Sequence, residues 1–261
     1  MLICPVCKAA LITCDKVSKC SNGHCFDVAK EGYINLLRSN KSGDMIGDSK
    51  QSARSRRDFL NKGYYDALKK HLVSTFVDES GSLIDICCGE GFYTAALGEN
   101  PNMDVYGFDI SKEMIRLASK RGNGTYFVAN LASIPIADDS FDYAIHLFAP
   151  FQEKEFCRIL KPGGRIFTVV PGARHLWGLK EQLYDTPYLN DEAIPETVNL
   201  RHVHTVKVTD KILLNSKEDI WSVFQMTPYF YRTSDADKSK LQQIEKLETD
   251  IEFVIVEYIK A

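Results

Sequence analysis

The sequence predicts an α/β fold with a doubly wound parallel sheet, preceded by a small metal-binding module. Short apolar runs alternate with helical patterns between residues 83 and 170, which is typical of βαβ units. The apolar run Leu83–Ile86 leads into a turn of small residues, Cys87–Gly91, and a helical pattern follows from residue 92. Two pairs of metal-ligand residues lie in the first 25 positions.

Length and composition are those of a globular protein. A chain of 261 residues, 44% of them hydrophobic, suits one large domain or one domain with a small appendage. No apolar stretch approaches membrane-spanning length, and the N-terminus lacks the basic segment and apolar core of a signal peptide. We therefore expect a cytoplasmic protein with no membrane partner, whose eight cysteines are thiols or metal ligands.

Charge is unevenly distributed along the chain. Residues 1–72 hold 13 Lys and Arg against 7 Asp and Glu, a net charge of +6, whereas the whole chain has a net charge of −3. A basic front segment on an acidic remainder is what an enzyme with an appended RNA-binding module would show. Other causes of such asymmetry are common, so the charge pattern only supports this interpretation.

The first 38 residues have the spacing of a structural zinc site. Cys4 and Cys7 form one pair, and Cys20 begins a second group that ends in His24 and Cys25. A hairpin is expected between the two groups, over residues 11–13 and 17–19. Three cysteines are thus predicted ligands, while the spacing leaves the fourth ligand open between His24 and Cys25. Cys14 is expected to be a bystander in the hairpin.

Residues 39–57 are polar and glycine-bearing, which predicts a linker to a third segment, 58–261. The basic residues of the linker are Lys50, Arg54, Arg56 and Arg57. They are equally compatible with RNA phosphate contacts and with a solvated linker. Apolar residues then recur at helical spacing from position 57 to 76, and Gly63 divides this region into two helices.

Five strands and three helices are expected in the core of the third segment. The strands are predicted near 83–87, 104–109, 125–129, 142–148 and 165–170, with helices near 92–99, 111–121 and 152–159; Ser111 is the predicted N-cap of the second helix. Helices near 217–225 and 237–247 and an antiparallel strand pair, 203–208 with 251–258, should close the sheet. A ligand of such a sheet binds at the carboxyl ends of its strands, where Asp85, Gly89, Glu90, Asp109 and Asn130 are expected.

The turn and two further features resemble the class I S-adenosylmethionine (SAM) methyltransferases. They are the D-x-x-x-G-x-G pattern from Asp85 to Gly91, the acid Asp109 closing the second strand, and the L-K-P-G-G turn at residues 160–164. An acid at the position of Asp109 can accept hydrogen bonds from both ribose hydroxyls. The resemblance covers about residues 60–175 and implies SAM as cofactor. Cys87 stands where that family usually has its first glycine, and we expect this small residue to be tolerated.

Joined to the N-terminal module, the pattern resembles the RlmA family of bacterial 23S rRNA guanine-N1 methyltransferases. The segment Phe26–Leu37 matches the family phrase F-D-x-A-K-E-G-Y-x-N-L-L, and residues 171–176 match P-G-x-R-H-L. The resemblance implies a Zn²⁺ site made by Cys4, Cys7, Cys20 and His24. It also implies SAM contacts by Tyr65, Asp85, Gly89, Glu90, Gly91, Asp109, Asn130 and His175.

The resemblance further implies methyl transfer from SAM to N1 of a guanine in a domain II hairpin of 23S rRNA. It is compatible with a homodimer and with macrolide resistance, which is associated with one branch of the family. Phe148, in the turn after the fourth strand, is either a stacking platform for the base or a core aromatic. Arg174 is a candidate phosphate contact. The sequence identifies neither the guanine nor the catalytic group that accepts its N1 proton.

Two other functions compete with this interpretation. One is a small-molecule SAM methyltransferase, such as a metabolite or quinone enzyme with an accessory zinc finger, in which removal of residues 1–40 should leave catalysis intact. The other is a non-enzymatic zinc-ribbon RNA-binding protein with a degenerate SAM fold. The intact set of Asp85, Gly89, Gly91 and Asp109 argues against the second.

Overall fold

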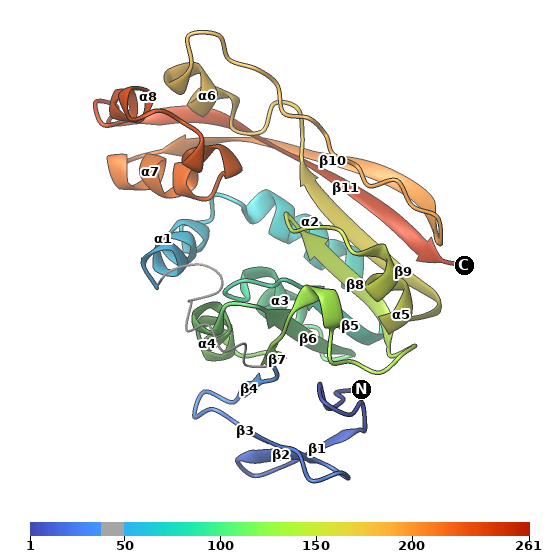
Figure 1. Ribbon diagram of the computed structural model, residues 1–261. Helices are drawn as coiled ribbons and strands as arrows, with labels where there is room; N and C mark the ends of the chain where they lie inside the picture. Colours follow the sequence, from blue (N-terminus) through green and yellow to red (C-terminus); the bar gives the residue numbers. More distant parts are fainter. Residues whose placement is uncertain (38–49) are drawn as a thin grey trace.

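The computed structural model describes residues 1–37 and 50–261, so residues 39–49 of the predicted linker lie outside the described residues. A small three-stranded antiparallel sheet at the N-terminus precedes a large eight-stranded sheet with helices on both faces (Figure 1). This arrangement confirms the predicted α/β fold with a small N-terminal module. In the described part of the chain, no helix combines the length and the apolar character needed to cross a membrane.

The N-terminal sheet confirms the predicted hairpin. Its strands are β1 (Leu11–Cys14), β2 (Val17–Cys20) and β3 (Cys25–Asp27), and Cys14 pairs with Val17 across a two-residue turn. The first residue of that turn, Asp15, has a left-handed backbone with φ of 54°. This backbone favours the tight reversal that aligns the two strands.

The large sheet is doubly wound. Its strand order is β10-β11-β9-β8-β5-β6-β7-β4, and β11 is antiparallel to both of its neighbours, β10 and β9. The chain runs outward from β5 to β6 and β7 on one side, and then from β5 to β8 and β9 on the other. The order therefore reverses between β5 and β8, the point where such sheets bind ligands. The bounds are β4 Ile34–Asn35, β5 Gly81–Ile86, β6 Met103–Asp109, β7 Thr125–Val128, β8 Phe141–Leu147, β9 Leu160–Pro171, β10 Leu200–Leu214 and β11 Leu247–Lys260.

Side chains alternate between the two faces of the sheet. Along β5, Leu83 belongs to a buried cluster with α2 and α3, whereas Ile84 and Ile86 belong to a cluster with α5. Both faces of a central parallel strand are covered, which explains its continuous apolar sequence. The helices are α1 Lys50–Asn61, α2 Asp66–Phe76, α3 Phe92–Leu97, α4 Lys112–Arg121, α5 Glu153–Ile159, α6 Trp177–Leu183, α7 Lys217–Gln225 and α8 Asp235–Leu241, with 3₁₀ turns at Leu131–Ser133 (η1) and Pro228–Tyr231 (η2).

The core elements match the predictions closely. Ser111 caps α4 as predicted, because its hydroxyl accepts a hydrogen bond from the Met114 N–H at 3.4 Å. Strand β9 begins at Leu160, so residues 160–164, which were predicted to form a turn before the strand, belong to the strand itself. Two further boundaries differ. Helix α1 begins at Lys50, so residues 50–57 of the predicted linker are helical, and α8 ends at Leu241, so the helix predicted to continue to 247 is too long.

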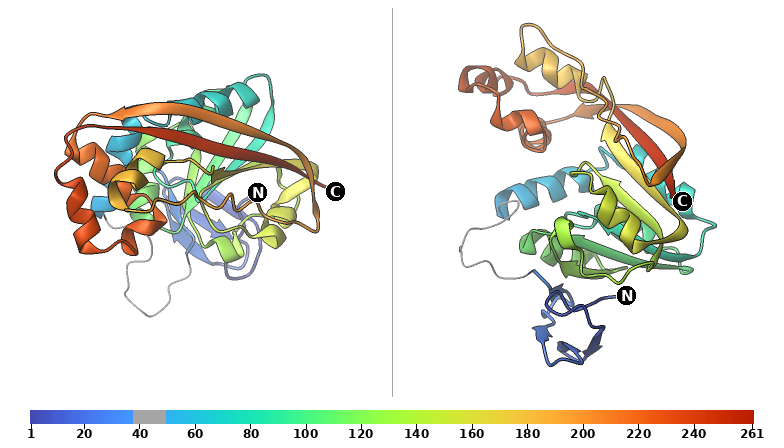
Figure 2. Two further views of the ribbon diagram at one scale, coloured as in Figure 1. Left: turned by 90° about the horizontal axis from the view of Figure 1, so that it is seen from above. Right: turned by 45° about the vertical axis from the view of Figure 1, so that its right-hand side comes forward.

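The C-terminal part departs most from the predictions. Helix α6 was not predicted, and β10 and β11 form an antiparallel pair of 15 and 14 residues that is far longer than the predicted pair. Figure 2 shows this strand pair extending along one edge of the molecule, with α6, α7 and α8 gathered at its end. Long-range pairing stabilises these strands beyond what their local sequence signals.

Candidate cofactor and metal sites

The structure brings the four predicted metal ligands together. The ligand atoms of Cys4, Cys7, Cys20 and His24 all lie within 4.8 Å of one another. His24 Nδ1 is 3.6 Å from Cys4 Sγ and 3.4 Å from Cys20 Sγ. A tetrahedral zinc ion with Zn–S bonds of about 2.3 Å separates its ligands by about 3.5–3.8 Å, so the four residues fit this ion.

The local backbone of the module favours ionised ligands and excludes the competing cysteine. A hydrogen bond from the Ala9 backbone N–H, followed by one from the Asn22 side chain, lowers the pKa of the Cys7 thiol to about 6. A thiolate is the form that binds a metal. Cys25 is exposed and its thiol lies against the Gly23 carbonyl oxygen at 3.4 Å, away from the cluster. The geometry therefore favours His24 over Cys25 as the fourth metal ligand.

The turn after β5 uses left-handed backbone at three positions. Cys87, Gly89 and Gly91 have φ of 59°, 56° and 78°. A Cβ atom on Gly89 would meet nothing within 4 Å, so this residue faces open space that a ligand can approach. A Cβ atom on Gly91 would lie 2.8 Å from the Ala118 Cβ, so Gly91 is required for the approach of α4. Helix α3 has only six residues, so its dipole is weak. The feature that suits ligand binding here is the accessible backbone of the turn.

Two carboxylates stand at the ends of adjacent strands. Asp109, at the end of β6, accepts hydrogen bonds from the Gly89 N–H at 3.1 Å and from the Ser111 N–H at 2.8 Å. Its side chain is half-buried, which leaves room for further acceptor contacts. Asp85, on β5, is 2% exposed and accepts from the Thr94 hydroxyl at 2.5 Å. Burial raises the pKa of Asp85 to about 7, so the site favours a cation beside it.

Glu90 and Asn130 are engaged with protein groups. Both oxygens of the buried Glu90 accept from the Arg121 guanidinium, at 2.6 and 2.8 Å, which joins the turn to the end of α4. The Asn130 side-chain oxygen accepts from the Ala132 N–H at 2.9 Å and so caps η1. Asn130 lies directly after β7, at the predicted edge of the sheet, where it is exposed.

Tyr65 and His175 lie together although 110 residues separate them. The Tyr65 hydroxyl is 3.2 Å from His175 Nε2, and the Glu252 N–H donates to His175 Nδ1 at 3.2 Å. Because Nδ1 accepts, the proton of the neutral ring is on Nε2, which donates to Tyr65 and leaves the tyrosine O–H as a donor to a ligand. Burial lowers the pKa of His175 to about 3, so the ring is neutral at physiological pH.

Phe253 of β11 connects these two residues to the turn after β8. Its ring centroid lies 5.0 Å from that of Tyr65, 4.8 Å from that of His175 and 5.7 Å from that of Phe148. Phe148 is 44% exposed and has a left-handed backbone with φ of 55°. Such strain in a non-glycine residue is typical of functional positions. Sequence reasoning missed Phe253 because it is one apolar residue in an ordinary strand pattern.

A buried lysine holds the turn that carries His175. Lys180 of α6 is 1% exposed, and its ammonium donates to the Asn190 side-chain oxygen at 2.6 Å and to the Tyr188 carbonyl at 2.9 Å. The Asn190 amide in turn donates to the carbonyl oxygens of Gly172 and His175, at 3.0 and 2.9 Å. The sequence alone gave no signal for either residue.

Arg174, the basic linker residues and the buried His146 have ordinary structural surroundings. His146 is buried at the end of β8, where its Nε2 lies 3.2 Å from the Pro150 carbonyl oxygen, and burial lowers its pKa to about 4. Arg174 is exposed and stands 4.9 Å above the Trp177 ring, with Asp250 at 3.4 Å. Of the basic linker residues, Arg54, Arg56 and Arg57 all lie on α1.

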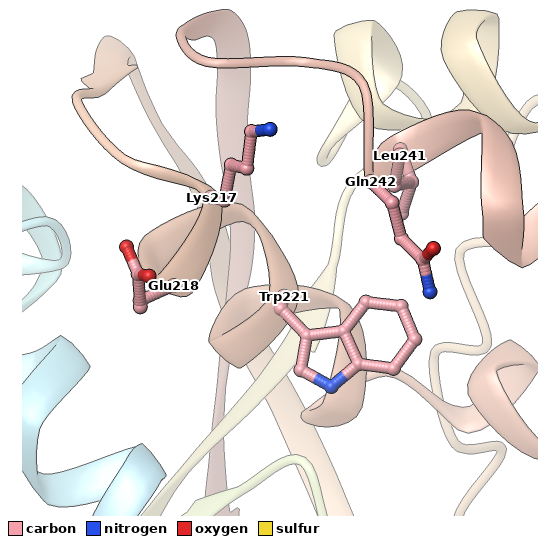
Figure 3. Close-up of a pocket in the computed structure, with 5 residues that line it drawn as sticks. All are labelled: Lys217, Glu218, Trp221, Leu241 and Gln242. Atoms are coloured by element: carbon pink, nitrogen blue, oxygen red, sulfur yellow. The ribbon is translucent and has the colours of Figure 1, made fainter.

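A surface pocket of about 260 Å³ lies between α7 and α8, apart from these residues (Figure 3). Its lining residues are Lys217, Glu218, Trp221, Leu241 and Gln242. In Figure 3 the Trp221 indole lies below the Gln242 side chain, and the charged ends of Lys217 and Glu218 point in different directions. None of the five is a predicted site residue.

Comparison with protein families finds two matches in this chain. Residues 2–42 match the family model described as RlmA, N-terminal, a zinc ribbon. Residues 83–164 match the model described as a methyltransferase domain.

Named relatives share different extents of the chain. The 23S rRNA (guanine(748)-N(1))-methyltransferase of Streptomyces fradiae is 33% identical over 190 residues, which are 70% of this chain and 67% of the relative. YxjB of Bacillus subtilis, provisionally named a 23S rRNA (guanine-N(1)-)-methyltransferase, is 28% identical over 98% of this chain and 96% of its own length. The demethylmenaquinone methyltransferase of a Geobacillus strain, WCH70, is 29% identical over 41% of this chain and 53% of its own.

Solved structures are similar in fold at low sequence identity. YcgJ of Bacillus subtilis has a TM-score of 0.48 at 18% identity, over 76% of this chain and 99% of that one. Phosphoethanolamine N-methyltransferase 2 of Haemonchus contortus, solved with S-adenosyl-L-methionine, has a TM-score of 0.48 at 17% identity, over 81% of this chain and 57% of that one.

Proposed function

Because the chain belongs to the family of 23S rRNA (guanine-N1)-methyltransferases, we propose that it methylates N1 of a guanine in a domain II hairpin of 23S rRNA. The chain is a SAM-dependent methyltransferase by its fold and its methyltransferase-domain match. The observation that carries the proposed substrate is the co-occurrence of the two matched parts in one chain: the RlmA-type zinc ribbon at residues 2–42 precedes the methyltransferase domain at residues 83–164.

The strand ends around β5 and β6 are the proposed SAM site. Gly89 would let the cofactor approach the backbone, Asp109 would accept from the ribose hydroxyls, and the exposed Asn130 lies where the adenine would bind. Asp85 would face the cationic amino-acid end, because a positive charge offsets the cost of burying its carboxylate. When bound, SAM supplies an electrophilic methyl group, so the protein contributes mainly alignment.

Tyr65 and His175 would orient the cofactor by a directed hydrogen bond. The neutral His175 ring fixes the direction of the Tyr65 hydroxyl, as derived above, and burial raises the Tyr65 pKa so that the hydroxyl keeps its proton. Gly91 and Glu90 would act by shaping the turn, since Gly91 packs against α4 and Glu90 pairs with Arg121.

The target base would stack on Phe148. This ring is half-exposed at the end of β8 and shares the neighbour Phe253 with Tyr65 and His175, which brings a stacked base next to the proposed cofactor residues. Base–aromatic stacking is common in single-stranded RNA recognition, and a paired guanine has to be flipped out before its N1 can react.

The zinc module would bring folded RNA to this site. Lys8, Lys16, Lys19 and Lys30 are exposed on it, and the phosphate backbone supplies the complementary charge. An rRNA substrate also places the proposed reaction in the cytoplasm, and a homodimer would extend the RNA-binding surface. The alternative small-molecule activity is less well supported, because the demethylmenaquinone methyltransferase match covers only 41% of this chain.

The proposed function is tested with purified protein, labelled SAM and 23S rRNA from a strain that lacks the enzyme. We expect N1-methylguanine in the domain II hairpin by mass spectrometry of nuclease fragments. The variant Asp109→Ala should bind SAM about 10- to 100-fold more weakly, because hydrogen bonds to a charged group contribute about 1.5–3 kcal/mol. Asp104→Ala, an exposed acid on the same strand, is the control. If the wild-type protein binds SAM but leaves the 23S rRNA unmodified, the proposed substrate is wrong.

A further inference from the structure

The N-terminal module is built into the edge of the methyltransferase sheet. Strand β4 pairs in parallel with β7, with Ile34 opposite Phe127 and Asn35 opposite Val128. The Leu36 N–H extends this ladder to the Val128 carbonyl oxygen at 2.9 Å. In Figure 1, β4 lies at the end of the sheet directly above the zinc module. The module therefore supplies the strand that covers the β7 edge.

A second contact holds the loop that follows β7. Leu2 bridges to Ile136, the Ile3 N–H donates to the Pro135 carbonyl at 2.9 Å, and the Ala137 N–H donates to the Met1 carbonyl at 2.8 Å. The Lys8 ammonium also reaches the Ser133 hydroxyl at 3.4 Å. Asn130, at the proposed adenine position, thus lies between β7 and the loop residues 133–137, both of which contact the module.

A third contact reaches the glycine turn through a buried cluster. Tyr33, 4% exposed, shares this cluster with Cys88 of the turn and with four residues of α4 and β7: Ile115, Ala118, Tyr126 and Val128. Two of these, Ala118 and Tyr126, are the groups that a Cβ on Gly91 would meet at 2.8 and 3.2 Å. The cluster that receives Tyr33 therefore also supports the backbone of the turn.

From these three contacts we infer that the zinc-loaded module positions the SAM site, and that zinc and SAM binding are coupled in the absence of RNA. The inference rests on the proposed SAM site and adds Tyr33 and β4 to it as positioning groups. A zinc ribbon of this size depends on its metal to fold, so loss of the ion would release β4 and Tyr33 together. β7 would then become an exposed edge, and Asn130 and the turn would lose their support.

The test measures binding of S-adenosylhomocysteine by calorimetry, with no RNA present. We expect chelated full-length protein and the variant Cys20→Ser to bind at least about fivefold more weakly than zinc-loaded wild type, the lower end of coupling between two sites. Cys25→Ser, an exposed cysteine outside the ligand set, is the matched control and should bind normally. Tyr33→Ala should weaken binding with zinc still bound, and Tyr33→Phe should restore it.

The reciprocal measurement covers the case in which the metal-free protein unfolds. Coupling between two ligands is equal in both directions, so S-adenosylhomocysteine should raise the zinc affinity of the folded protein by the same factor. That affinity is measured by equilibrium competition with a chelator of known strength. Equal zinc affinity with and without S-adenosylhomocysteine, or normal binding by Tyr33→Ala, would overturn the inference while rRNA methylation could stand. A zinc-loaded wild type that binds no S-adenosylhomocysteine would instead overturn the proposed function.

Discussion

Asp85 and His175 are both buried, and burial shifts their pKa values in opposite directions. Burial raises the Asp85 pKa from 3.8 to about 7 and lowers that of His175 from 6.5 to about 3. Each shift favours the neutral form of the group, because removing a charge from water is costly. At neutral pH the His175 ring is therefore neutral, and the Asp85 carboxyl is partly protonated.

The pH dependence of stability tests this account of Asp85. The folded protein binds the Asp85 proton more tightly than the unfolded chain, so this residue lowers the free energy of unfolding as pH rises from about 4 to about 7. In Asp85→Asn that decline is removed. Denaturant unfolding at pH 5 and pH 8 should therefore show a larger drop toward pH 8 in wild type than in the variant. The buried histidines are common to both proteins, and equal changes with pH would contradict the assignment.

The left-handed backbone at Cys87 costs folding free energy. The sequence had predicted only that a cysteine is tolerated at this position. Its φ of 59° is unfavourable for a residue with a Cβ, by about 1–2 kcal/mol, while glycine loses about 0.5–1 kcal/mol more backbone entropy on folding. We expect Cys87→Gly to raise the free energy of unfolding by up to about 1 kcal/mol. The matched control Cys88→Gly, at a buried position without left-handed backbone, should lower it. A decrease for both variants would contradict the strain at Cys87.

At the scale of elements, α6 and the segment after it position the His175 turn. Lys180 donates to Asn190, whose amide holds the carbonyl oxygens of Gly172 and His175. A buried ammonium is retained at such a place when it satisfies acceptors that would otherwise be buried without a partner.

Hydrogen exchange of the Asn190 backbone N–H reports on this arrangement, because that group donates to the Ala173 carbonyl at 2.9 Å. In Lys180→Met this backbone N–H should exchange at least about tenfold faster, since an unsatisfied buried acceptor costs about 1–3 kcal/mol. Glu181→Gln, an exposed neighbour on the same helix, serves as control. Unchanged protection of Asn190 in Lys180→Met would show that the lysine does not hold the turn.

For the whole molecule, charge and topology together separate delivery of RNA from binding of the cofactor. Residues 1–72 have a net charge of +6. The zinc module within this segment lies at the β4 end of the large sheet, opposite the β10 end. Exposed lysines at the β1–β2 hairpin are placed for phosphate contacts rather than for packing.

The salt dependence of RNA binding tests whether lysines of the β1–β2 hairpin contact RNA phosphates. In the double variant Lys16→Ala and Lys19→Ala, the slope of log affinity against log salt should fall by about one for each lysine that contacts phosphate. Affinity for S-adenosylhomocysteine should not change. Lys246→Ala, an exposed lysine in the C-terminal part, is the control. An unaltered slope in the double variant would place the RNA on another face.

The sequence by itself determined the parts whose chemistry is local. Ligand spacing indicated Cys4, Cys7 and Cys20, with the fourth ligand open between His24 and Cys25, and the family resemblance implied His24. Alternating patterns indicated the order of core strands and helices, because such patterns depend on residues a few positions apart. Only the tertiary structure decided that β4 completes the large sheet and that Phe253 joins Phe148 to His175. Such contacts depend on strand order and register between distant segments, and the packing of whole sheets selects these without a local sequence signal.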